Sequence, residues 1–115
     1  MTIATLTEGP AVLVGYEYRL QLEAEGALFP DEARFAGQVR RNANAETVLA
    51  TLSSESSTIL RRSDNTMELI IPETVTGALA PGSVVLDLVR TDLVPPQHLN
   101  VFLEIPVLLP VTRGL

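Results

Sequence analysis

Apolar and polar residues alternate along the chain in short runs, the pattern of half-buried β-strands. The clearest run is "GYEYRLQLEA" (15–24), in which every second residue is apolar: Tyr16, Tyr18, Leu20 and Leu22. Because successive side chains of a strand point to opposite faces, this spacing predicts that both tyrosines pack in the core beside the leucines.

Similar runs predict further strands at 34–41, 47–52, 58–62, 66–72, 83–92 and 101–115. Segments rich in Gly, Pro, Asn, Asp and Ser separate them, as expected of turns and loops, and one such loop is "LVPPQHLN" (93–100). A single short helical turn is predicted near 73–80, because Pro72 precedes it, Glu73 lies in its first turn and Gly77 limits its length.

Two strands have a clear core face. Met67, Leu69 and Ile71 share one face of the strand at 66–72. In the strand that begins at residue 83, the core face comprises Val84, Leu86 and Leu88, which places Asp87 on the outer face. We interpret Asp87 as a cross-strand partner of an arginine or as a contact with a neighbouring subunit.

The last segment, "VFLEIPVLLPVTRGL" (101–115), contains Pro106 and Pro110, which cannot donate to a strand ladder. These prolines favour an edge strand, a bulge or a switch between sheets. We expect 101–107 to be the last buried strand. Residues 108–115 either continue it or form an arm that adds to the sheet edge of a partner. The ends at 1–10 and 108–115 are therefore candidate partner contacts.

Seven to nine short strands with one helical turn predict an all-β sandwich or barrel. The 115 residues fit a single domain, 1–115, without a linker. The chain has no cysteine, which excludes a disulfide framework and a thiolate zinc site. No run of 18 apolar residues or basic leader is present, so we expect no membrane association.

The charged residues argue against nucleic-acid binding, since the net charge is −6 and no basic stripe is present. Arg40-Arg41 and Arg61-Arg62 are the only basic clusters. Either one arginine of each pair faces solvent while the other packs its stem along the sheet, or the pairs face acidic patches of a neighbouring copy.

Candidate chemistry is sparse. His98 is the only histidine, and it lies in the predicted 93–100 loop, so we interpret it as a loop residue and not as a proton shuttle. We predict no enzymatic activity, no metal and no cofactor. The candidate protein-interface residues are Arg40, Arg41, Arg61, Arg62, Asp87, Pro95, Pro96, His98, Pro110 and Arg113.

Three segments carry a resemblance: "FAGQVRR" (35–41), "TGALAPGSVVLDLVRTD" (76–92) and "FLEIPVLLPVTRG" (102–114). They resemble the immunoglobulin-like β-sandwich domains of tailed-bacteriophage virion proteins, such as the N-terminal domain of baseplate upper proteins. The resemblance covers roughly the last two-thirds of the chain. It departs at "LVPPQHLN", which is longer than the family's hairpin and marks a candidate contact.

The resemblance implies an immunoglobulin-like antiparallel β-sandwich and a non-enzymatic structural component of a virion, in the tail, baseplate or head–tail region. Its partners would be other virion proteins and copies of itself, assembled in the host cytoplasm, with neither nucleic acid nor membrane bound. The alternatives are a capsid decoration protein and a receptor- or glycan-binding module. A grooved surface with exposed tyrosines would accompany glycan binding.

Overall fold

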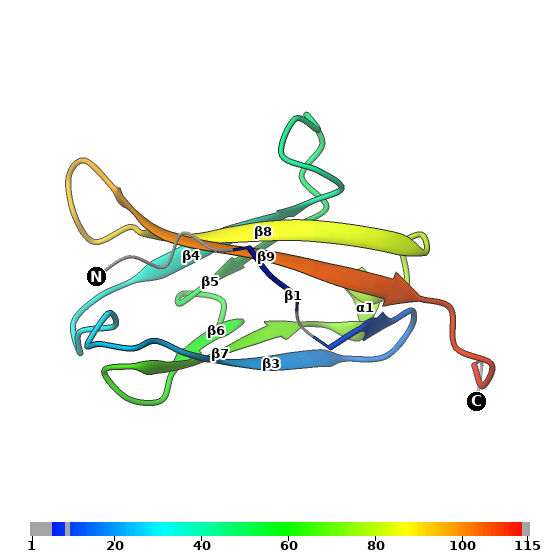
Figure 1. Ribbon diagram of the computed structural model, residues 1–115, viewed down its shortest axis with the longest axis horizontal. Helices are drawn as coiled ribbons and strands as arrows, with labels where there is room; N and C mark the ends of the chain where they lie inside the picture. The colour runs from blue at the N-terminus through cyan, green and yellow to red at the C-terminus, as the bar shows by residue number, and fades with distance from the viewer. Residues whose placement is uncertain (1–5, 9, 114–115) are drawn as a thin grey trace.

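A computed structural model describes residues 6–8 and 10–113, which fold into two sheets packed face to face (Figure 1). The large sheet holds six strands: β1 (Leu6–Glu8), β2 (Val12–Leu13), β4 (Phe35–Arg40), β5 (Ala50–Ser53), β8 (Gly82–Arg90) and β9 (Gln97–Leu108). The small sheet holds three: β3 (Tyr18–Glu23), β6 (Ile59–Arg61) and β7 (Thr66–Ile71). The prediction of an all-β sandwich with seven to nine strands is confirmed.

The strand order is β1-β9-β8-β4-β5 in the large sheet and β3-β7-β6 in the small sheet. The strands β9-β8-β4-β5 and β3-β7-β6 correspond to G-F-C-C′ and B-E-D of a variable-type immunoglobulin domain. The pairs among β3 to β9 are antiparallel, as predicted. The short strands β1 and β2 were not predicted, and both run parallel to β9.

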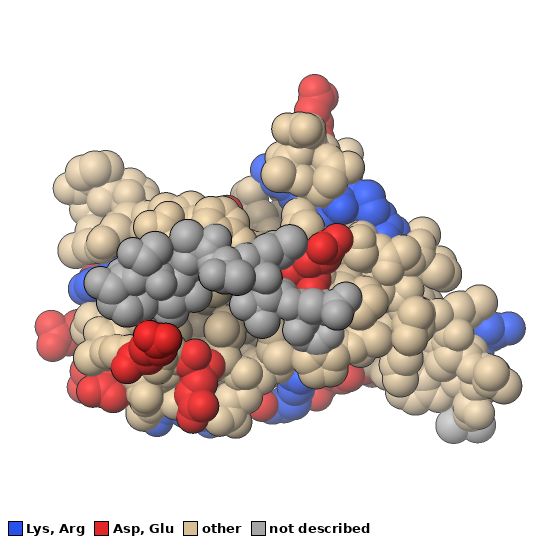
Figure 2. Space-filling view, in the orientation of Figure 1, with Lys and Arg blue, Asp and Glu red and all other residues tan. Residues whose placement is uncertain are grey.

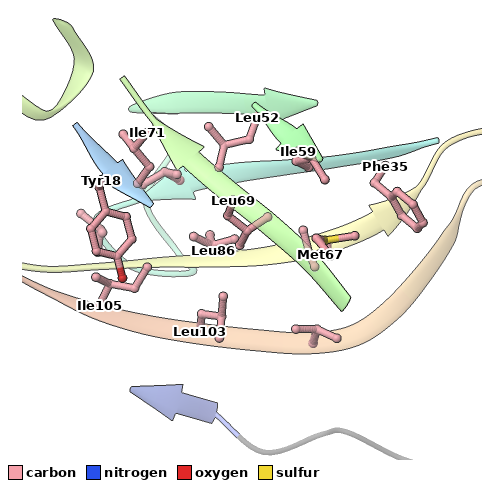
Figure 3. Close-up of a cluster of buried hydrophobic side chains, with 14 of the residues drawn as sticks. Tyr18, Phe35, Leu52, Ile59, Met67, Leu69, Ile71, Leu86, Leu103 and Ile105 are labelled. Carbon is pink, nitrogen blue, oxygen red and sulfur yellow. The ribbon is translucent and has the colours of Figure 1, made fainter. Parts of the chain in front are cut away.

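The core lies between the two sheets and consists of the alternate residues of each strand (Figure 3). Both predicted core faces are buried, that of β7 and that of β8. Phe29, from the loop before β4, packs edge-on against Phe35 with ring centroids 5.6 Å apart. Each fully buried large apolar side chain contributes about 1.5–3 kcal/mol relative to exposure, so these faces hold the sheets together.

The helical turn α1 (Glu73–Thr76) follows Pro72 and ends at Gly77, so it is shorter than the predicted 73–80. Thr76 is fully buried and its hydroxyl donates to the backbone carbonyl of Tyr16, 2.7 Å away. This bond fixes the segment before β3 against the turn. Within the described residues, no helix is long and apolar enough to cross a membrane.

The two tyrosines have different environments, contrary to the prediction that both pack in the core. β3 begins at Tyr18, which is buried and donates its hydroxyl to the carbonyl of Pro10, 2.7 Å away. Burial raises the pKa of Tyr18 to about 12. Tyr16 precedes the strand, is 37% exposed and donates its hydroxyl to the carbonyl of Thr112.

β9 corrects one prediction and decides between alternatives at two further points. It begins at Gln97, so 97–100 is not loop; 101–107 is buried strand as expected, and the strand ends at Leu108 instead of continuing through the tail. Of the alternatives that its prolines favoured, the edge strand is excluded, because β8 pairs on one side and β1 and β2 on the other. The Val14 N–H donates to the Leu108 carbonyl, so even-numbered residues here direct their backbone groups toward β1 and β2. Pro106 lies between the stretches that those two strands pair, where its missing N–H loses no bond.

Candidate interaction surfaces

A β-bulge shapes the outer face of the large sheet. The pairing of β8 with β9 shifts between Asp87, which lies opposite Phe102, and Val89, which lies opposite His98. The additional β9 residues include Asn100, whose φ of 59° is left-handed. The bulge brings the rings of His98 and Phe102 together, stacked with centroids 5.1 Å apart.

Asp87 and His98 form a side-chain pair on this face, with Oδ2 2.8 Å from Nε2. The backbone N–H of Asn100 donates to His98 Nδ1, 2.9 Å away. Because an N–H donates only to an unprotonated nitrogen, Nδ1 is the acceptor and Nε2 carries the proton that reaches Asp87. The predicted outer-face position of Asp87 is confirmed, but its partner is a strand histidine and not an arginine.

This pair differs from a hydrolytic triad. A triad histidine uses one ring nitrogen for the acid and the other for a nucleophile, whereas both nitrogens of His98 are already engaged. The pair is also well exposed, so its hydrogen bond adds little to the stability of the fold. Among the described residues, no group of three or more His, Cys, Asp or Glu side chains could hold a metal ion.

A half-open groove of about 370 Å³ lies beside the pair on the same face. Its lining is mostly apolar, with Phe102 as the exposed aromatic ring, and comprises Gln38, Arg40, Ala43, Val85, Leu86, Asp87, Phe102 and Leu103. The loop 41–49 stands above the sheet at the top of Figure 1 and contributes Ala43. The groove contains no tyrosine, the residue expected for a glycan-binding surface.

Gly37 lets β4 pass close to β8 near this groove. A Cβ at position 37 would lie 2.5 Å from the backbone oxygen of Asp87, which is closer than side-chain carbons approach backbone atoms. Gly37 is therefore required for the local strand spacing, and it supports the position of Asp87.

Arg40 and Arg41 both bind their own chain. Arg40 donates to the base of the 41–49 loop and to a neighbouring amide, while Arg41 reaches the start of β8. The accepting oxygens belong to Gln38, Ala45, Glu46, Ala80 and Ser83. These bonds hold the 41–49 loop and the turn before β8 in place.

Arg61 and Arg62 point in different directions, as expected if one arginine of the pair packs along the sheet and the other faces solvent. Arg61 donates to the Phe29 carbonyl at 2.8 Å, and its side chain is 28% exposed. Arg62 pairs with Glu68, and its side chain is 52% exposed. The pair borders a second, charged hollow of about 520 Å³ at the end of the sandwich.

The remaining candidates lie at opposite ends of the molecule. Pro95 and Pro96 are exposed in the loop joining β8 to β9, beside Val94 at 98% exposure. Pro110 and Arg113 follow β9, and the Arg113 guanidinium donates to the Pro110 carbonyl. Of the predicted contact ends, residues 6–8 pair with β9, while residues 1–5, 9, 114 and 115 lie outside the described part of the chain.

Apolar side chains gather at the end of β9, and we call this cluster the end patch. It comprises Leu13, Tyr16, Leu108, Leu109 and Val111, all exposed. Leu13 is the strand partner of Leu108, and the Tyr16 hydroxyl bond to Thr112 holds the tail beside them. The apolar run at 108–111 contains three of these five residues, but nothing in the sequence linked Leu13 and Tyr16 to it.

Strand order alone does not assign a function, because β-sandwiches have many roles. The fold is a two-sheet β-sandwich with an immunoglobulin-like strand order. No protein-family model matches the chain, and no curated protein matches it either.

Proposed function

We propose that the protein is a non-enzymatic structural component of a bacteriophage virion, in the tail, baseplate or head–tail region, that acts through repeated protein–protein contacts. The end patch is the observation that carries this proposal. Contiguous exposed apolar side chains on a folded domain commonly mark contacts with other proteins. In an assembly of many copies, each such contact can be individually weak.

Two further observations support the proposal. The segments that resemble virion domains form β4, β8 and β9, which are adjacent in the large sheet, and the last of them runs into the end patch. The ring nitrogens of His98 are both engaged, which favours a binding role over catalysis.

Particle composition tests the proposal. Particles purified from the host that encodes the chain should contain the protein by mass spectrometry. Labelling with a specific antibody should place it on the tail or baseplate, whereas labelling over the capsid would favour a decoration protein. Absence from purified particles would contradict both versions.

A matched pair of variants tests the role of the end patch. Val111 in the tail and Val94 in the β8–β9 loop are both 98% exposed, so replacing either with serine should leave the fold intact. We expect Val111→Ser to reduce incorporation into particles and Val94→Ser to leave it unchanged. The reverse result would move the contact to the proline-containing loop.

A further inference from the structure

The small sheet has an open edge along β3. Within the described residues, β3 pairs with β7 alone, and β7 also pairs with β6. The Ile70 N–H donates to the Thr58 carbonyl on the β6 side. Because backbone groups alternate sides along a strand, those of Leu69 and Ile71 point to β3.

The register of β3 against β7 then determines which backbone N–H and C=O groups of β3 point to the open edge. Leu20 lies opposite Leu69, so its backbone groups point toward β7. The Ala24 N–H donates to the Asn65 carbonyl at 2.8 Å, which agrees with this alternation. The backbone N–H and C=O groups of Arg19, Gln21 and Glu23 therefore point away from β7, toward the open edge.

The two faces beside this edge differ. The side chains of Arg19, Gln21 and Glu23 are exposed, whereas Leu20 and Leu22 are half-buried and pack against the core. An added strand with apolar residues at every second position would therefore complete the cover of the core.

The tail after β9 has such a sequence. Leu109 and Val111 are exposed, two residues apart, and Pro110 between them has no N–H. Figure 1 shows the tail leaving the body beyond the end of β9, whereas β3 runs from that end back into the body. The tail therefore does not run along the β3 edge of its own chain, although its Thr112 carbonyl accepts a hydrogen bond from Tyr16.

We propose that residues 109–113 of one copy add as a parallel strand to the β3 edge of a second copy. In a parallel pair, a residue bonds to the two neighbours of the residue opposite it. With Leu109 opposite Leu20 and Val111 opposite Leu22, the tail backbone meets the free groups of β3. The inference rests on the proposed role in repeated contacts and specifies how copies join.

The parallel direction follows from the side chains. It places Leu109 and Val111 on the core side, next to Leu20 and Leu22, and turns Pro110 outward, where it loses no hydrogen bond. An antiparallel strand with the same backbone groups facing β3 would place both apolar side chains on the solvent side instead.

Acidic residues lie at the end of this edge. A parallel tail brings Arg113 to the end of β3, where Glu23 and Glu25 are exposed, but its side chain shares the face of Leu109 and Val111 and not that of Glu23. Figure 2 shows acidic side chains gathered at the lower left, the region in which β3 ends in Figure 1. An antiparallel tail would carry the arginine to the other end of the strand.

Amide hydrogen exchange measured by NMR on the full chain at low and high protein concentration tests the pairing. We expect the amides of Gln21 and Glu23, which in this register donate to the carbonyls of Leu109 and Val111, to exchange rapidly at low concentration and to become protected at high concentration. The Leu20 and Leu22 amides, bonded to β7, should be protected in both samples and serve as internal controls.

Three outcomes would overturn the inference: association without protection of these two amides, protection that is already complete at low concentration, or no association at all. None of these decides whether the protein is a virion component, since particle composition measures that separately.

A pair of variants at one position gives a second test. Gln21→Pro removes an outward N–H, whereas Gln21→Ala keeps it, and neither touches a bond to β7. We expect the proline variant to fold, by circular dichroism, and to remain monomeric, while the alanine variant associates like the parent. If the proline variant unfolds, Val111→Asp, in the tail and outside every strand, replaces it and should also remain monomeric. A folded Gln21→Pro or Val111→Asp protein that associates fully would contradict the proposal.

Discussion

Single residues determine the backbone path around the Asp87–His98 pair. Gly37 allows β4 to approach the Asp87 carbonyl, and Asn100 adopts the left-handed conformation at the bulge. Asparagine tolerates that conformation better than most residues with a side chain. The groove and the pair thus depend on two residues that are not themselves charged or aromatic.

Gly37→Ala should destabilise the protein by about 1–3 kcal/mol, because the new methyl group meets a backbone atom that cannot rotate away. Chemical denaturation measures the loss. Gly26→Ala is the control, since a Cβ there has open space. Equal effects of the two substitutions would contradict the close approach.

Asp92 should make stability depend on acid pH. It accepts two hydrogen bonds from Arg90 and one from the Arg34 backbone N–H, and these hold the pKa of its carboxyl at about 2, against 3.8 for the free group. Between about pH 4 and pH 2 the unfolded chain therefore takes up a proton that the folded chain does not, and stability falls as the pH falls.

Denaturant titrations across this range should show a shallower decline for Asp92→Asn than for the parent, because the titrating group is gone. Arg90→Gln should flatten the decline in the same way, since it removes the main partner of Asp92. An unchanged slope in both variants would show that other carboxyls dominate acid unfolding.

Strands with one buried face could be predicted from the sequence. Strands that depend on pairing with residues far away in the sequence could not. β4, β7 and β8 alternate clearly because one side of each faces the core. The start of β9 follows two prolines and reads as loop, and β1 and β2 are too short to show a period. The Asp87–His98 pair depends on the bulge, which their spacing of 11 residues does not reveal.

Adjacent residues of β8 should respond very differently to truncation. Leu88 is fully buried, so Leu88→Ala should cost about 2–5 kcal/mol, whereas Val89→Ala on the outer face should cost about 1 kcal/mol or less. Thermal or denaturant unfolding compares the two variants. Similar losses would contradict the assignment of the two faces.

At the scale of the whole molecule, charge and apolar surface have different roles. The chain carries a net charge of −6, and the arginines of both pairs already bind oxygen atoms of their own chain. The end patch remains uncovered at the end of the large sheet. Contacts between copies should therefore be mainly apolar and backbone-mediated.

Association should consequently persist in concentrated sodium chloride. Salt screens exposed charge pairs but does not weaken apolar burial. Sedimentation velocity at low and high salt measures the fraction of associated chain. Dissociation in high salt would instead support the alternative in which the arginine pairs face acids of a neighbouring copy.

The central place of β9 also sets the order in which the chain can fold. This last strand separates β8 from β1 and β2, so the first strands have no partner until the final part of the domain has left the ribosome. Contacts between residues so distant in sequence are slow to form. The N-terminal segment must therefore wait, unpaired, through most of the domain's synthesis, and this is the interval in which aggregation competes most with folding.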